Sequence, residues 1–207
     1  RSSSTAVGWN KSPHLHDYID RAMKTGVTGV SATLAASYQT FEGFLAEVRV
    51  WRETMLERED QFIFVNDVSD ILRAHEEGKY AVIWNVQTTS VLNGNTARVS
   101  TLRAMGVSSM QLVYNDTYRS GDGVVAYWHG RDRGLTDYGM QIIDEMVRHG
   151  IIVDLSHTGR NTCNDIIAYM NEQHPGVPVI PGEVYLSPGF EGGRTVFCAV
   201  DAAGRLV

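Results

Sequence analysis

The residues best suited to chemistry in this sequence are Asp154, Ser156 and His157, which place an acid, a hydroxyl and an imidazole within four positions. They come at the end of the segment 151–155, which is apolar at every position except Asp154 and follows a helical stretch ending at Gly150. A continuous apolar run of this kind predicts a parallel strand buried on both faces. Barrels and open α/β sheets place their active sites at the carboxyl-terminal ends of such strands. His157 is therefore a candidate metal ligand or general base, unless Ser156 and His157 only cap the next helix or satisfy buried backbone.

Strands and helices alternate along the rest of the chain. Apolar runs predict the strands, and apolar residues on a helical period predict the helices, with Gly106 and Gly150 as stop signals. Thr136 is a suitable N-cap for the helix that leads to the His157 strand. The expected strands cover 27–34, 80–86, 109–114, 151–155 and 177–180, and the expected helices cover 41–59, 68–77, 96–105, 136–149 and 161–172. The stretch 116–134, rich in Gly and Asp, is expected to be a loop.

This alternation indicates a parallel α/β fold. Crossovers between parallel strands are right-handed, which leaves a barrel or a doubly wound sheet. The sequence has no GxGxxG after the first strand and no GxxxxGK motif, so nucleotide binding is not signalled and the barrel is favoured. A complete eight-fold barrel takes about 250 residues. We therefore expect a partial (β/α)8 TIM-like barrel, with parallel strands in sequence order, helices on the outside and one open sheet edge.

The composition excludes several classes of protein. The 207 residues carry 18 basic and 24 acidic side chains, a net charge of −6, which argues against a nucleic-acid partner. No apolar run approaches the roughly 20 residues that span a bilayer, and no basic-then-apolar leader is present. The two cysteines, Cys163 and Cys198, form neither a disulfide framework nor a zinc-type cluster. A cytoplasmic location is the default expectation, for a chain whose opening residues look like the middle of a longer one.

The segment 134–157 carries motifs of a known family. The run Gly134-Leu135-Thr136-Asp137-Tyr138-Gly139, followed by 143–157 with its Asp154-Leu155-Ser156-His157 ending, resembles the core of the membrane (renal-type) dipeptidase family, the M19 metallopeptidases. The segments 86–90 and 106–115 resemble two upstream strand ends of that family. The dipeptidase barrel domain is expected to span residues 1–180. The resemblance stops after Ile180, so the tail 181–207 is expected to lie outside it.

This resemblance implies a metal-dependent hydrolase with a (β/α)8 barrel and two zinc ions at its carboxyl-terminal mouth. It implies that dipeptides are hydrolysed by a hydroxide that bridges the two metals. Imidazole and carboxylate ligands suit such a pair of ions, which together lower the pKa of a shared water. The expected partners are a small dipeptide substrate and a second copy of the chain in a homodimer, with no nucleic acid and no membrane segment.

Residue by residue, the resemblance assigns metal and substrate roles at three strand ends. His157 matches the family's histidine ligand of the second zinc, and Gln87 falls where the family has a bridging glutamate. Tyr114 stands where renal-type members have a substrate-facing histidine, and Asn115 follows it as in the family. A tyrosine at this position can donate a hydrogen bond to an oxyanion. We expect the side chains of Gln87, Tyr114 and His157 to converge on one cleft, and Asp154 to face away from it by strand alternation.

Other parts of the family's site have no counterpart in this sequence. The first-strand His-x-Asp pair is absent, and His14 and His16 are interpreted as surface histidines of a helix. Glu183 falls where a later histidine ligand is expected, but nothing around it resembles the family. No catalytic residue is assigned. Two functions from different classes follow: a zinc-dependent dipeptidase represented by a partial chain, or a non-catalytic remnant of the family with a crippled metal site.

Overall fold

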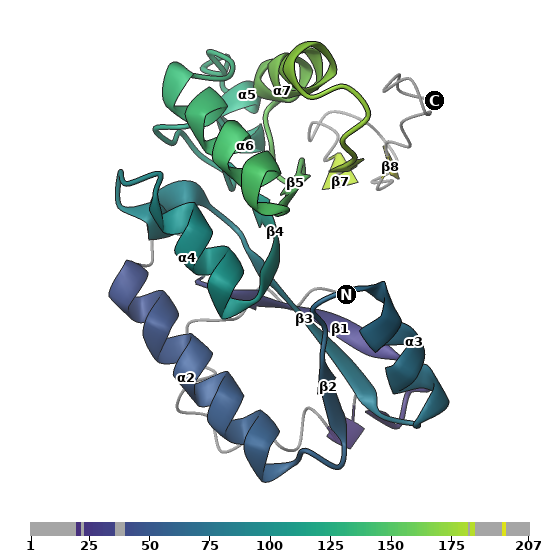
Figure 1. The fold of residues 1–207 in the computed structure, drawn as a ribbon. Coiled ribbons are helices and arrows are strands. Elements are labelled where there is room, and N and C mark those ends of the chain that lie inside the picture. The colour runs from purple at the N-terminus through teal and green to yellow at the C-terminus, as the bar shows by residue number, and fades with distance from the viewer. Residues whose placement is uncertain (1–19, 22, 36–39, 182, 185–195, 198–207) are drawn as a thin grey trace.

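Six parallel strands form the central sheet of this protein (Figure 1). The computed structural model describes residues 20–21, 23–35, 40–181, 183–184 and 196–197. Four predicted strands are parallel neighbours in sequence order: β1 (Gly29–Leu34), β3 (Tyr80–Val86), β4 (Val107–Gln111) and β5 (Ile152–Asp154). The sheet continues into β6 (Val179–Ile180). Within the described residues it is open and does not close into a barrel.

One strand, β2 (Phe62–Phe64), is missing from the sequence-based prediction, because three residues are too few to show a period. It pairs with the first three residues of β3, and β4 pairs with the same edge of β3 from Trp84 onward. The opposite edge of β3 is occupied by β1. The register between β3 and β4 shifts between Trp84 and Asn85, just past the place where β2 ends its pairing.

The helix α6 (Asp137–His149) begins and ends at the capping residues that the sequence predicts. The hydroxyl of Thr136 accepts a hydrogen bond from the Gly139 amide at the start of α6, and Gly150 ends that helix with a φ of +70°.

No helix among the described residues has the length and apolar character needed to cross a membrane. The other helical elements are α2 (Phe41–Glu57), α3 (Val68–Glu76), η2 (Thr89–Leu92), α4 (Arg98–Met105), α5 (Val124–Trp128) and α7 (Arg160–Gln173).

Strand alternation divides these helices between the two faces of the sheet. The side chains of Val82, Trp84 and Val86 belong to the main core, together with those of α2, α4, α6 and α7. Ala81 and Ile83 point the other way, into a smaller cluster with β2 and α3. In Figure 1, α2 and α4 accordingly lie on one side of the strands and α3 on the other. The helix α3 therefore departs from the expectation that every helix lies on the outside.

Two further predictions about the elements need correction. The stretch 116–134 is not all loop, because it contains α5, which at five residues is too short to show a helical period. The strand β5 is not buried on both faces: Val153 is 1% exposed, but Ile152 is 39% exposed. Helices cover the Val153 face, and the Ile152 face has no such cover among the described residues. The proposed tail 181–207 is described at Pro181 and at the antiparallel pair β7 (Glu183–Val184) and β8 (Val196–Phe197), which is separate from the main sheet. Its boundary stays a prediction. His14, His16 and Cys198 lie outside the described residues.

Candidate active site

His157 lies in a tight turn just after β5, at the carboxyl-terminal edge of the sheet. Its φ is +63°, in the left-handed region that costs a non-glycine residue about 1 to 3 kcal/mol. The loop after β4 stabilises this conformation, because the His157 carbonyl accepts a hydrogen bond from the Val124 amide at 2.8 Å. In addition, Thr158 forms an isolated antiparallel bridge with Gly123. The position of the imidazole thus depends on contacts with a loop more than 30 residues earlier in the chain.

Two residues of the loop after β4, Tyr114 and Asn115, hold the imidazole of His157. Its Nδ1 lies 2.9 Å from the side-chain oxygen of Asn115. Its ring stacks on Tyr114, with centroids 4.0 Å apart and an angle of 27° between the planes. Because the Asn115 oxygen can only accept, this pairing places a proton on Nδ1, and in the neutral imidazole Nε2 then carries the lone pair. A histidine ligand of a metal is commonly oriented in this way by a hydrogen bond to its other nitrogen.

Gly123 brings the loop after β4 against the residues that hold the imidazole. A Cβ at position 123 would lie 2.1 Å from the carbonyl oxygen of Tyr114 and 2.5 Å from the carbonyl carbon of Asn115. Both atoms belong to the backbone and cannot move aside without moving the strand end. Glycine at 123 therefore permits the close packing that sets the Val124–His157 hydrogen bond.

The interpretation of Ser156 and His157 as caps of the next helix is wrong. The N-cap of α7 is Gly159, which has no side chain to accept a hydrogen bond. The first amides of α7 donate instead to Asp132: Asn161 N lies 2.6 Å from Oδ2, and Thr162 N lies 3.2 Å from Oδ1. The carboxylate of Asp154 accepts from the amide of Ser156 at 2.9 Å, so it stabilises its own turn.

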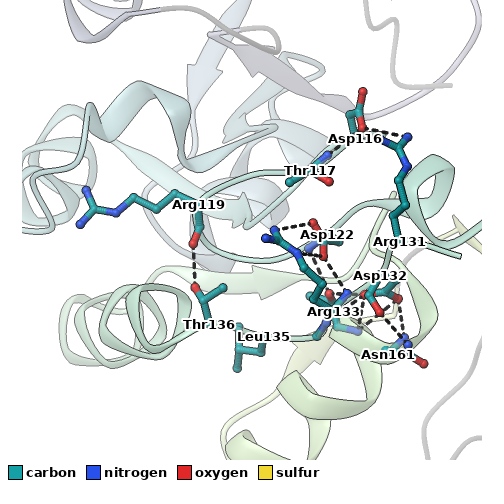
Figure 2. A network of polar contacts seen from close by, with 12 residues as sticks. Asp116, Thr117, Arg119, Asp122, Arg131, Asp132, Arg133, Leu135, Thr136 and Asn161 are labelled. Carbon is teal, nitrogen blue, oxygen red and sulfur yellow. Dashed lines mark hydrogen bonds and ion pairs between the residues drawn. The ribbon is translucent and has the colours of Figure 1, made fainter. Parts of the chain in front are cut away.

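Two buried aspartates, Asp122 and Asp132, connect the loop after β4 to the segment that follows His157 and starts α7 (Figure 2). Asp122, fully buried, accepts hydrogen bonds from the amide, Nε and Nη2 of Arg133 at 2.7 to 3.0 Å. Asp132 accepts from the Thr162 hydroxyl at 2.7 Å, and that hydroxyl accepts from the Asp122 amide at 3.0 Å. The Asp122 carbonyl accepts from the Gly159 amide, two residues after His157. This network was not predicted from the sequence, and the clustering of Asp and Gly in 116–134 was the one signal that could have indicated it.

The network gives the fold a dependence on pH through Asp122. Burial alone would raise the pKa of this carboxyl group, but hydrogen bonds from the side chain and amide of Arg133 and from Thr117 lower it more, so the pKa lies below its ordinary value. A carboxyl group with a lowered pKa stabilises the fold above its unfolded pKa of about 3.9, and this contribution is lost as the pH falls through the folded pKa. We expect the free energy of unfolding to decrease as the pH falls below about 5, and to decrease less steeply in Asp122→Asn.

Urea unfolding followed at several pH values between about 7 and about 3 measures this dependence. Asp137→Asn is the matched control, because Asp137 is exposed at the start of α6. Equal flattening of the pH dependence in both variants would contradict the role of Asp122.

Gln87 is the first residue after β3 and is 4% exposed. Its strand is separated from β5 by β4, and thus by two strand spacings of about 4.8 Å each. The ring contact and hydrogen bond that join Tyr114, Asn115 and His157 do not include Gln87. The structure therefore brings three of the four predicted site residues together, whereas the convergence of Gln87 on His157 and the roles of all four stay predictions.

The described residues do not make a zinc site by themselves. A catalytic zinc takes three protein ligands and a water, and carboxylates or further imidazoles usually accompany the first histidine. No group of three or more His, Cys, Asp or Glu side chains in the described part of the chain is placed to hold a metal ion. His157 and Gln87 are the two residues that the family resemblance assigns to the metal, and they fall short of this number.

The fold and these strand-end residues define a parallel α/β protein with its candidate site at the carboxyl-terminal edge of the sheet. The chain belongs to the membrane dipeptidase family, peptidase family M19, whose family model matches residues 5–180. This confirms the family expected from the 134–157 motifs. It also places the chain in a family of hydrolytic enzymes, because peptidases cleave their substrates with water.

Relatives and solved structures agree with this assignment. An uncharacterized dipeptidase of Schizosaccharomyces pombe is 28% identical over 125 residues, which cover 59% of this chain and 30% of the relative. An amidohydrolase from Pseudomonas aeruginosa matches with a TM-score of 0.69 and 27% identity, over 74% of this chain and 46% of that chain. A metallopeptidase from Rhodobacter sphaeroides, solved with a phosphinate mimic of the dipeptide L-Ala-D-Ala, shares the fold, with a TM-score of 0.59 and 18% identity over 83% of this chain and 48% of that chain. The chain thus spans less than half the length of these relatives.

Proposed function

We propose that this chain is part of a zinc-dependent dipeptidase, in which His157 is a metal ligand through Nε2. The observation that carries the proposal is the hydrogen bond between Nδ1 of His157 and the side-chain oxygen of Asn115, at 2.9 Å. It fixes the tautomer that a neutral imidazole ligand needs and orients the ring at the carboxyl-terminal edge of the sheet. Membership of the M19 family supports the reaction, which is hydrolysis of a peptide bond between two amino acids.

The neighbouring residues take distinct roles in this proposal. Asn115, which the sequence suggests as a substrate contact, is instead a positioning residue for the His157 ring. Tyr114 packs against the same ring and is a neutral hydrogen-bond donor for a substrate oxygen. Gln87 is proposed as an oxygen ligand, and it lacks the charge that a bridging glutamate would add. L-Ala-D-Ala is the first substrate to test, because the Rhodobacter sphaeroides relative was solved with a mimic of it.

Two further expectations remain proposals. We propose a cytoplasmic location, which agrees with the use of only two cysteines in 207 residues. Fractionation of the cells that produce the protein would test it. A homodimer is implied by the family resemblance alone, and sedimentation equilibrium of the purified chain would test it.

Zinc titration followed at each histidine ring by NMR tests the ligand assignment. We expect zinc to shift the ring signals of His157 at lower concentration than those of His149 and His174, whose Nε2 atoms face Glu145 and Asp144. His149→Ala is the matched control and should leave the His157 response unchanged, whereas His157→Ala should remove the first binding event. A first event located at another histidine would refute the assignment.

The second candidate function is a non-catalytic member of the family with a crippled metal site. It is favoured by the absence of a three-ligand group among the described residues. The two candidates differ in turnover, because only the dipeptidase releases free amino acids from L-Ala-D-Ala.

A further inference from the structure

A cavity of about 280 Å³ opens among the loops after β3 and β4 and shares no residue with the candidate active site. It is lined by four residues of the segment 89–94 after β3, by Tyr118 and Arg119 in the loop after β4, and by Tyr138 in the first turn of α6. Neither Gln87 nor any residue of the Tyr114–Asn115–His157 cluster lines it. Its volume is that of about nine water molecules, enough for a small organic molecule.

The charge of the cavity lining is positive. Arg119 is its one charged residue, and the remaining side chains contribute hydroxyl groups and the amide of Asn93. No Asp or Glu lines the cavity, although the chain as a whole has a net charge of −6. A guanidinium group surrounded by neutral hydrogen-bond donors favours an anion over a cation or a neutral ligand.

The guanidinium of Arg119 is held in place. Its central carbon lies 4.2 Å from the centroid of the Tyr138 ring, in a cation–π contact. The carbonyl oxygen of the same residue accepts a hydrogen bond from the Thr136 hydroxyl at 2.7 Å. Figure 2 shows that the side chain extends away from Asp122 and Arg133, and so apart from the buried carboxylates of that network. Stacking uses the face of the guanidinium and leaves the N–H groups in its plane for a ligand.

The backbone of the segment 89–94 leaves room for the guanidinium of Arg119. Gly94 has a φ of +77°, and a Cβ at this position would lie 3.0 Å from Nη1 of Arg119. Glycine therefore lets the guanidinium lie against the segment 89–94. Asn93, also in the left-handed region with a φ of +47°, precedes it and contributes to the cavity wall.

Tyr138 supplies a second hydrogen-bonding group that lacks a partner. Its hydroxyl oxygen is shielded from solvent and has no hydrogen-bond partner among the described residues. A buried hydroxyl without a partner is unfavourable, and an oxygen atom of a bound anion would accept its proton. Burial raises the pKa of Tyr138 more than Arg119 lowers it, so the hydroxyl keeps this proton at neutral pH.

We propose that this cavity binds a small carboxylate, held by the in-plane N–H groups of Arg119 and by the hydroxyl of Tyr138. A carboxylate is planar and matches the fork of a guanidinium with two parallel hydrogen bonds. Binding of a carboxylate in this cavity requires neither a metal nor a hydrolytic reaction. The proposal therefore does not depend on the proposed dipeptidase function.

Titration of the full chain with sodium acetate at constant ionic strength tests the site, with sodium chloride as the reference. The readouts are the NMR signal of the Arg119 Nε–H group and the melting temperature. We expect a saturable change with a dissociation constant on the order of 1 mM. Arg119→Gln should weaken binding by at least about tenfold, and Tyr138→Phe, which keeps the stacked ring, by about three- to tenfold.

Arg131→Gln is the matched control, because Arg131 is exposed in the same region and pairs with Asp116. It should change acetate binding by less than about twofold. No saturable response to acetate, or equal weakening in Arg131→Gln and Arg119→Gln, would overturn the site. Inorganic phosphate that binds at least about tenfold more tightly than acetate would overturn the assignment to carboxylates. Unchanged acetate affinity in Tyr138→Phe would show that the Tyr138 hydroxyl does not bind the carboxylate.

Discussion

The 207-residue chain by itself is expected to bind zinc with a dissociation constant above about 10 µM, far weaker than zinc sites with a full set of ligands. It is expected to hydrolyse L-Ala-D-Ala more slowly than about 10⁻³ s⁻¹, at least a thousandfold below the range typical of enzymes. The physical reason is the small number of ligands. His157 supplies one imidazole and Gln87 one neutral oxygen, and the carboxylates that would offset the charge of two zinc ions are missing from the described residues.

Calorimetric zinc titration and an assay for released alanine measure both quantities on the purified chain. A full-length relative with the family's upstream His-x-Asp pair and downstream histidine should bind zinc tightly and turn over under the same conditions. Two equivalents of tightly bound zinc on the 207-residue chain, with turnover abolished by His157→Ala, would contradict the expectation. His14, His16 and Glu183 would then be the first residues to test as additional ligands.

Replacement of Asp132 by Ala is expected to lower the free energy of unfolding by about 3 to 5 kcal/mol. The Asp132 carboxylate is 9% exposed and accepts hydrogen bonds from the amides of Gly134, Asn161 and Thr162 and from the Thr162 hydroxyl. Alanine would leave these donors without an acceptor, at the first turn of α7 and near the backbone of the loop after β4. Loss of a buried acceptor with several donors is among the most destabilising single substitutions.

Urea unfolding of the wild type and three variants tests this expectation. Asp132→Asn keeps the shape and one acceptor oxygen, so its cost should be smaller, roughly 1 to 3 kcal/mol. Asp116→Ala is the matched control in the same loop, because its carboxylate is half exposed and lies 3.8 Å from Arg131, so its cost should stay within about 1 kcal/mol. Equal costs for Asp132→Ala and Asp116→Ala would show that the buried network contributes little to stability.

Replacement of Asp132 should also change the surroundings of His157 in the candidate active site. The amides at the start of α7 and the carbonyl of Asp122 flank the turn that holds His157 in its left-handed conformation. NMR of folded Asp132→Asn should therefore show a changed chemical shift for the His157 ring and little change for His75, which lies on α3. A His157 signal identical to that of the wild type would limit the role of Asp132 to the stability of α7.

Local patterns in the sequence determined most of the strands and helices and the order of the four main strands. Apolar runs and helical periods are properties of neighbouring residues, so strands β1, β3, β4 and β5 and their parallel order could be predicted. Thr136 and Gly150 cap α6 as predicted, because capping depends on a few adjacent residues. The position of His157 at the carboxyl-terminal end of a strand, and the family, followed from the 134–157 motifs.

Tertiary structure alone decided how these elements meet, because the interactions concerned join residues far apart in the chain. The bond from His157 to Asn115 spans 42 positions, and it underlies our proposal that Asn115 positions the His157 ring. The N-terminus of α7 is capped by Asp132, 29 positions before Asn161, where the sequence offers only Gly159. The face of the sheet that α3 covers, and the exposure of Ile152 in an apolar strand, depend on which helices pack where. Hydrophobic period specifies that a face is buried, whereas the partner that buries it is set by the path of the whole chain.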